Sequence, residues 1–350
     1  MSSCDWINHF SHNPVTPLLE SGNYAIEYFV RRDILEESVE DISTIWELKE
    51  VQKILKKQTS RGYWKSNSAN KRRNPAQNYE LLETYRHTNI LVNMYGMNRK
   101  HPCIEKAADY LFSCQTDEDD IRGIIGEQYA PYYNGIIVSN LNRAGYADDP
   151  RVERIIKWLL SMRQNDGGWI IGSPGCMGNY SMEERNALTT QFVGTRHDFD
   201  RDQPFGHSGT GMVIRAFATH HIYCKSSEAR HAAVLLATSF FKRNNHASYQ
   251  HPDNWVRFKY PFWWTDLISA LDSISLIGLP FDNPSIAEAL KWFIDNQLPS
   301  GLWNHSYSKI HKYVENAKTR ELRLWISLAI LRVFKNFRNQ DVSSQKTMVK

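Results

Sequence analysis

The stretch that decides the fold is Gln58-Thr59-Ser60-Arg61-Gly62-Tyr63-Trp64, which reads Q-x-x-x-G-x-W. The phrase returns as Gln297-Leu298-Pro299-Ser300-Gly301-Leu302-Trp303, and one residue shorter as Gln164-Asn165-Asp166-Gly167-Gly168-Trp169. Each copy follows a segment with the periodicity of an amphipathic helix. A phrase that recurs at the same place after a helix indicates an array of equivalent helical units.

The segments that precede the phrase also repeat. Residues 96–115, 145–164 and 278–297 each begin with glycine, reach a proline after a few residues and end at glutamine. The glycine ends one helix in a left-handed conformation, and the proline fills the first position of the next helix, directly after an N-cap residue. The N-cap residues predicted in this way are His101, Asp149 and Asn283.

Between these amphipathic outer helices lie segments that are apolar on more than one face, at residues 132–141, 206–217, 267–277 and 324–333. A helix that is apolar nearly all round is buried, so we predict alternating outer and inner helices. Weaker copies near residues 17–35 and 229–244 bring the expected total to five or six helical hairpins. The predicted fold is all-α, an α/α toroid that forms a single barrel domain over residues 14–338, with flexible termini at 1–13 and 339–350.

Composition and charge exclude several classes of protein. Of the 350 residues, 41% are apolar and 23% are charged, which is typical of a folded protein. The net charge is only +4, which argues against a surface dedicated to nucleic acid, and the basic run Lys71-Arg72-Arg73 is predicted to be a solvated loop.

Five scattered cysteines predict free thiols in a reducing compartment. No signal peptide or membrane span is recognisable, so we expect a cytoplasmic protein for which peripheral membrane contact stays possible.

The Q-x-x-x-G-x-W phrase resembles the QW repeat of squalene–hopene and oxidosqualene cyclases. The resemblance is closest to the single-barrel prenyltransferase/squalene-oxidase repeat proteins, through residues 115–116, 121–123, 128–133 and 261–266. It implies a terpenoid cyclase-like toroid in which the repeat glutamine caps a neighbouring helix and the tryptophan packs beneath it. It also implies that a central cavity holds an apolar small molecule.

Asp117-Glu118-Asp119-Asp120 spells D-x-D-D, the acid motif of class II terpene cyclases. The resemblance implies that Asp119 protonates an alkene or epoxide, while Asp117 and Asp120 hold that proton in position. Clustered carboxyls suit this role because a neighbouring like charge favours the protonated form in a dry site. The alternative is a solvated turn, because the motif directly follows Gln115 and places Asp119 where the repeat expects glycine.

Asp266 is a second candidate acid. It follows Trp263 and Trp264 at the start of a predicted inner helix, and a carboxyl beside tryptophans has the setting of a proton donor with a raised pKa. The alternatives are that Asp266 caps this helix or pairs with an inner-helix arginine such as Arg215. Asp272 lies six residues further on, so it points to a different face and is expected to pair with another helix.

Further polar and aromatic candidates lie on the inner segments. His207 opens one of them, as a base, a polar ligand contact or simply a hydrogen-bonding group at a helix N-terminus. Tyr132, Tyr133 and Trp325 join Trp263 and Trp264 as aromatics that we place near the cavity. Their faces would stabilise carbocations in a cyclase; otherwise these side chains fill the core.

Three functions remain open. The first is a class II-like terpene (isoprenoid) cyclase or isomerase that uses an aspartate proton in an apolar aromatic cavity. The second is a non-catalytic isoprenoid- or lipid-binding toroid, and the third is a carbohydrate-active α/α barrel. We expect no cofactor and no metal, because the D-x-C zinc motif of protein prenyltransferases, a P-loop and a D-D-x-x-D/E magnesium motif are all absent.

Overall fold

A computed structural model of the chain describes residues 5–66, 76–171, 198, 200–243, 251–309 and 314–348, with side chains as far as 340. Within these ranges every named element is a helix, so the prediction of an all-α protein is confirmed. The loop expected at residues 71–73 lies outside the described residues. The chain forms two compact units. Unit 1 contains Met1–Asp41, Cys224–Arg243 and His251–Lys350, and unit 2 contains Ile42–Tyr223 and residues 244–250.

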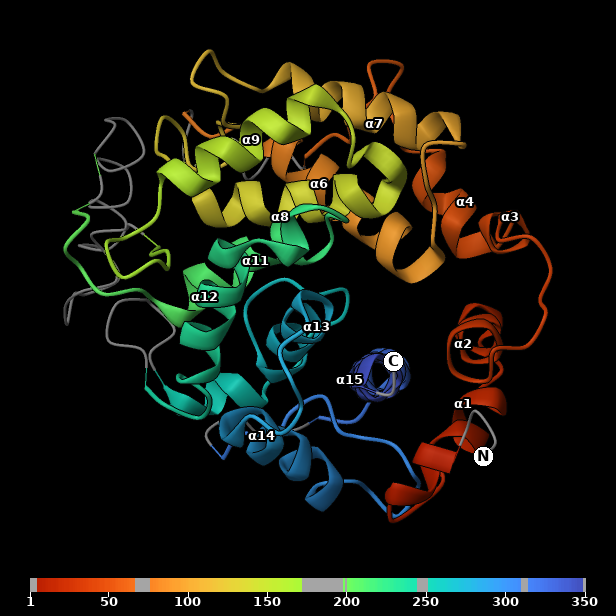
Figure 1. Cartoon of the computed structure of the whole chain (residues 1–350). Helices are drawn as coiled ribbons and strands as arrows, with labels where there is room; N and C mark the ends of the chain where they lie inside the picture. Colours follow the sequence, from red (N-terminus) through yellow and green to blue (C-terminus); the bar gives the residue numbers. More distant parts are fainter. Residues whose placement is uncertain are drawn as a thin grey trace. The chain divides into compact units, whose positions relative to one another are not determined.

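Unit 2 alternates outer and inner helices, as the sequence pattern predicts. Its helices are α3 (Ser43–Trp46), α4 (Lys49–Leu55), α6 (Tyr79–Tyr95), α7 (Pro102–Ser113), α8 (Pro131–Leu141), the π-helix η3 (Asn142–Tyr146), α9 (Pro150–Ser161) and α11 (His207–Ala218). Every residue of α8 and of α11 is buried, whereas α9 buries a single stripe. The two buried helices lie side by side (Figure 1). Their approach is so close that a Cβ on Gly135 would lie 2.5 Å from the Cα of Val213.

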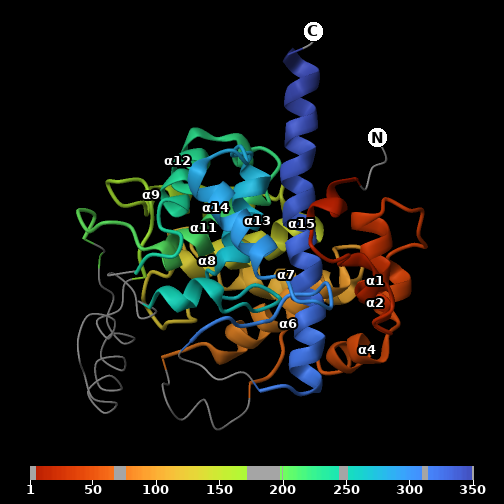
Figure 2. The ribbon, with the colours of Figure 1, turned by 90° about the horizontal axis from the view of Figure 1, so that it is seen from below.

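Unit 1 is built around two inner helices. Its elements are η1 (Asp5–His9), α1 (Val15–Leu19), α2 (Tyr24–Phe29), the π-helix η2 (Val30–Ile34), α12 (Ser227–Ala237), η6 (Pro252–Val256), α13 (Leu267–Ile277), α14 (Pro284–Asp295) and α15 (Ala317–Met348). Helix α13 is buried along nearly all its length and packs against α15. Figure 2 shows α15 as one long continuous rod.

The predicted helix ends are confirmed. His101, Asp149 and Asn283 each accept a hydrogen bond from a backbone N–H of the first turn that follows, with proline at the start of the helix. Gly96 and Gly278 end the preceding helices with φ of 59° and 88°, a conformation that glycine adopts without steric cost.

The repeated phrase forms a turn that joins neighbouring segments. In the last copy, Gln297 Nε2 donates to Gly301 O at 2.9 Å and to His12 O at 2.8 Å. The Trp303 indole N–H donates back to Phe293 O of α14 at 2.7 Å. The first copy makes the equivalent bonds through Gln58 and Trp64, to Gly62, Cys103 and Ile54.

The two terminal segments outside the predicted domain, residues 1–13 and 339–350, contain helix where the structure describes them. Trp6 and Phe10, which lie in the segment expected to be flexible, are buried, and Phe10 packs edge-on against Trp303 and Phe334 with centroids 5.4 and 4.9 Å away. At the other end, α15 continues through residue 339 to Met348. The sequence reading missed the two aromatics because a short helical segment has no periodicity to reveal it.

Candidate functional site

The acidic motif occupies an outer turn of unit 2 that matches the repeated phrase. Gln115 Nε2 donates to Asp119 O at 3.0 Å and to Arg151 O at 3.2 Å, as the repeat glutamines do elsewhere. Asp119 has φ +74°, and the glycine at the same place in the first copy, Gly62, has φ +89°. Ile121 stands in the place of the tryptophan and is 3% exposed. The motif therefore lies on the connection between α7 and α8, outside both helices.

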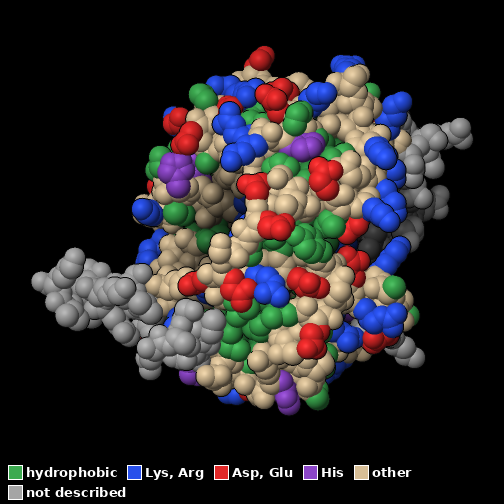
Figure 3. All heavy atoms as spheres, turned by 90° about the vertical axis from the view of Figure 1, so that its right-hand side faces the viewer, with side chains coloured by type: hydrophobic (Ala, Val, Ile, Leu, Met, Phe, Trp, Pro, Cys, Tyr) green, Lys and Arg blue, Asp and Glu red, His purple; other side chains and the backbone are tan. Residues whose placement is uncertain are grey.

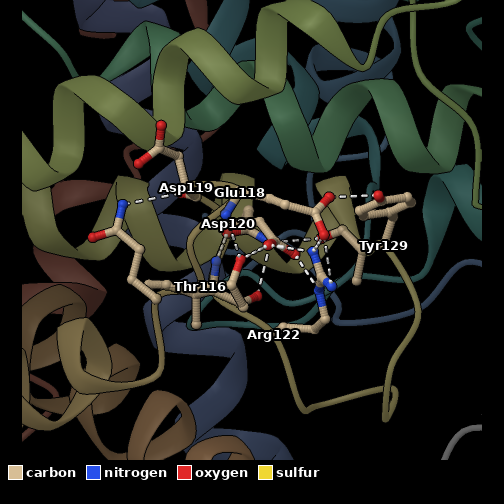
Figure 4. A network of polar contacts seen from close by, with 10 residues as sticks. Thr116, Glu118, Asp119, Asp120, Arg122 and Tyr129 are labelled. Atoms are coloured by element: carbon tan, nitrogen blue, oxygen red, sulfur yellow. Dashed lines mark hydrogen bonds and ion pairs between the residues drawn. The ribbon is translucent and has the colours of Figure 1, made fainter. Parts of the chain in front are cut away.

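Three carboxylates of this turn, those of Glu118, Asp119 and Asp120, have specific partners, and Figure 4 shows the contacts around Glu118 and Asp120. Asp119, whose side chain is 43% exposed, pairs with Arg154 at 3.0 Å. Asp120 is fully buried, accepts two hydrogen bonds from Arg122 at 3.0 and 2.7 Å, and contacts the Thr116 hydroxyl at 2.5 Å. Asp119 is thus half of an exposed ion pair and Asp120 is enclosed by its partners, which suits the turn alternative better than a proton donor in a cavity.

The Asp120–Arg122 pair also fixes the rest of this turn. Burial opposes the charge of Arg122, but the hydrogen bonds and charge of Asp120 outweigh it and raise the pKa of the guanidinium. The guanidinium lies 4.8 Å from the centroid of the Tyr129 ring, whose hydroxyl bonds Glu118 at 2.5 Å. Asp117 is exposed on the same turn. We attribute to this network the rigid entry of the chain into α8.

Asp266 lies at the N-terminus of the inner helix α13 and is 3% exposed. Its Oδ1 accepts the backbone N–H of Ser269 at 2.8 Å, and the Ser269 hydroxyl accepts the backbone N–H of Asp266 at 3.0 Å. This reciprocal capping box confirms the helix-cap alternative for Asp266. The stretch Tyr260-Pro261-Phe262-Trp263-Trp264 is half-buried, and Thr265, between this stretch and Asp266, is buried.

A charged and aromatic cluster that sequence reasoning missed lies beside this run in unit 1. Tyr260 stacks on Trp325 of α15, with ring centroids 5.7 Å apart and planes inclined by 7°. Arg332, two turns further along α15, donates to the Tyr260 hydroxyl at 3.1 Å. The guanidinium also makes two bonds, of 2.9 and 2.6 Å, to one oxygen of Asp33. An arginine within the otherwise apolar segment 324–333 is the sequence signal that could have indicated this cluster.

Two arginines share the carboxylate of Asp33. The guanidinium groups of Arg32 and Arg332 each lie 4.8 Å from the centroid of the Phe29 ring, and Arg32 contacts the second oxygen of Asp33 at 2.5 Å. Burial raises the pKa of Asp33, but the charges of Arg332 and Arg32 and their hydrogen bonds lower it further than burial raises it. Burial likewise opposes the charge of Arg332, yet Asp33, Tyr260 and Asp272 raise its pKa. The charge of Asp272 thus acts on a residue of α15, while the pairing expected for Asp272 stays a prediction.

The other candidates lie in unit 2. Tyr132 and Tyr133 of α8 are buried with ring centroids 5.0 Å apart, and Tyr133 packs edge-on against Tyr85 of α6 at 6.5 Å. His207 opens α11, is 4% exposed, and has its pKa lowered to about 4 by burial. The candidates therefore form two groups, and only Trp263, Trp264, Trp325 and Asp266 share unit 1.

Charge and metal-ligand patterns add no further site. On the face drawn in Figure 3, Lys and Arg side chains lie among Asp and Glu side chains. Within the described residues, no group of three His, Cys, Asp or Glu side chains is placed to hold a metal ion. Among the described helices, none combines the length and the apolar character that a bilayer crossing requires.

Comparisons with known proteins show distant likeness only. No protein-family model matches this chain, and no curated protein matches it. A solved polysaccharide lyase has 10% identity and a TM-score of 0.45, covering 97% of this chain and 99% of the lyase. The type II terpene cyclase MstE from Scytonema has 11% identity and a TM-score of 0.30, covering 85% of this chain and 99% of its own. Because both TM-scores are below 0.5, these likenesses carry no argument about the function of this chain.

Proposed function

We propose that unit 1 binds an apolar isoprenoid and that Asp266 donates the proton that starts its cyclisation or isomerisation. One observation carries the proposal: a carboxyl that is only 3% exposed follows, one residue on, a half-buried run from Tyr260 to Trp264 that is aromatic except for Pro261. The resemblance of the repeated phrase to the QW repeat points to the same class of enzyme. Asp117, Asp119 and Asp120 have no part in the proposed reaction, since their turn lies outside the inner helices.

The chemistry requires a carboxyl that keeps its proton away from water, and burial favours that neutral form. Oδ1 of Asp266 accepts the helix-cap hydrogen bond at 2.8 Å, and Oδ2 accepts a longer one from the Lys259 backbone N–H at 3.4 Å, so we assign the proton to Oδ2. The O–H bond of Asp266 breaks, a C–H bond forms at one alkene carbon, and the alkene π pair is used in that bond. The carbocation that results is stabilised by aromatic faces such as those of Trp263 and Trp264. Loss of a proton from a neighbouring carbon to the carboxylate then restores Asp266.

The decisive variant is Asp266→Asn, because asparagine caps a helix about as well as aspartate but has no carboxyl proton. Purified protein is incubated with squalene, farnesol and geranylgeraniol, and products are identified by gas chromatography with mass spectrometry. We expect turnover by the wild type and a loss of about 10²-fold or more in Asp266→Asn, the usual contribution of a general acid. The matched control is Asp119→Asn, which removes an outer-turn carboxylate and leaves turnover unchanged.

Two outcomes would contradict the proposal: no product from the wild type, or equal product from Asp266→Asn. Native mass spectrometry of the gently purified protein separates the remaining case. An apolar molecule that copurifies chemically unchanged, with no turnover of any substrate, indicates a binding protein in place of an enzyme.

A further inference from the structure

The guanidinium of Arg332 lies at one end of the aromatic run of unit 1, residues 260–264. Arg332 donates to the hydroxyl of Tyr260, the first residue of the run, and Tyr260 is held flat against Trp325. Trp325 and Arg332 lie seven residues apart on α15, which is two turns of one helix face. One helix therefore holds Tyr260 at both its ring and its hydroxyl, and it places a cation at the edge of the aromatic surface.

Arg332 keeps hydrogen-bonding capacity at this edge. A guanidinium has five N–H donors, and acceptors among the described residues take three of those of Arg332: one at Tyr260 and two at Asp33. The side chain is 22% exposed, so it can be reached from outside. Its orientation is fixed by the Asp33 carboxylate on one side and the Phe29 ring on the other.

The surrounding charges determine which group such a donor would hold. The cations near Arg332 are Arg32, Lys335 and Arg338, and the anions are Asp33, Glu36 and Asp272. With Arg332 itself, four positive charges face three negative charges. A nearly balanced cluster attracts a phosphate or carboxylate weakly, while a spare N–H still stabilises an uncharged oxygen acceptor.

We infer that the ligand of unit 1 is an isoprenoid with an uncharged oxygen group, a hydroxyl or carbonyl, which Arg332 binds beside Tyr260. The inference rests on the proposed function and narrows its substrate class. Asp33 is a positioning residue in this arrangement, because it holds the guanidinium in place and contacts no ligand itself.

The test compares three probes with the same carbon skeleton: farnesol, the hydrocarbon farnesene and farnesoic acid. Each is presented from the same detergent micelles, and binding is followed by quenching of tryptophan fluorescence. We expect the wild type to bind farnesol about tenfold more tightly than farnesene, as one hydrogen bond to a charged donor provides. Farnesoic acid should gain nothing over farnesol.

Arg332→Met should bring the farnesol and farnesene affinities to within about twofold of each other. The matched control is Arg32→Met, which removes the other cation beside Phe29 and should keep the preference. If Arg332→Met fails to fold because Asp33 loses a partner, the double variant Arg332→Met/Asp33→Asn removes both charges and supplies the same comparison.

The outcomes separate the two proposals. Equal binding of farnesol and farnesene by the wild type overturns the oxygen-bearing ligand and leaves an apolar site intact. A preference that survives in Arg332→Met, or tighter binding of farnesoic acid than of farnesol, also overturns it. Absence of binding by all three probes overturns this inference and the proposed function together.

Discussion

The hydroxyl of Thr210 forms hydrogen bonds with both the backbone N–H and the backbone carbonyl of Trp169. Its Oγ1 accepts from Trp169 N at 2.9 Å and donates to Trp169 O at 3.0 Å. The equivalent place in other copies holds a polar side chain of the inner helix as well, and the backbone N–H at the tryptophan position donates to Thr84, Ser327 or, from Ile121, Asn134. The repeat thus has a second half, which lies on the inner helix and was not recognised from the phrase.

Thr210→Val should lower the free energy of unfolding by about 1–3 kcal/mol, because it leaves the buried N–H of Trp169 without its partner, while the Trp169 carbonyl keeps the Gly206 N–H. Urea denaturation measures the change. Thr238→Val, at an exposed position of unit 1, should change stability by less than about 0.5 kcal/mol. Equal effects of the two variants would contradict the role that we assign to Thr210.

Asp119→Gly should stabilise the protein by about 0.5–1 kcal/mol. Glycine adopts φ +74° without strain, and the exposed ion pair with Arg154 that is lost contributes little. The reverse change, Gly301→Ala, should be strongly destabilising, because φ is +82° there and the new Cβ would lie 2.3 Å from Asn13 O. Thermal melting of both variants decides whether the two turns are equivalent.

Stability should fall as the pH drops from about 6.5 to about 4 through the titration of His207. Its folded-state pKa is lowered to about 4 by burial, so the unfolded chain takes up the proton first. The free energy of unfolding is highest above pH 6.5, where His207 is neutral in both states. It falls as the pH is lowered to about 4, by about 3 kcal/mol at most. Denaturation of His207→Gln across this range should give a flatter profile, and an unchanged profile would argue against a neutral buried imidazole.

Asp266→Ala should cost about 1–2 kcal/mol through loss of the cap on α13, whereas Asp266→Asn should cost a few tenths. Equilibrium unfolding of the two variants, side by side, separates the capping role of the carboxyl from its proposed part in proton transfer. A large loss in Asp266→Asn would mean that the charge, and not the cap, holds this helix end.

The helix ends could be predicted because they depend on local chemistry. Asp149 before Pro150 signals a helix start whatever surrounds it, and the structure places that start at Pro150. The role of Asp119 could not be predicted from residue type, because four consecutive acidic residues suit an active site and a turn equally well. Only the spacing from Gln115 indicated the turn.

The partners of contacts between distant residues could not be predicted. Arg332 stands out in an apolar segment, but it lies 299 residues from Asp33, and no pattern in either segment identifies the other as its partner. The weaker copy expected near residues 229–244 has a tryptophan beyond the expected range. Trp255 donates to Lys242 O at 3.1 Å and is 1% exposed, yet the recognised phrase does not precede it.

The two hydrogen bonds between His12 and Gln297 can form only late in translation. His12 is translated 285 residues before the glutamine that binds it, a delay of roughly 15–60 s at ribosomal speed. During that interval the stretch from Ile42 to Tyr223, which makes up most of unit 2, has already emerged. The ring of Phe10 packs against Trp303 and Phe334, so it stays uncovered until those two residues have been translated.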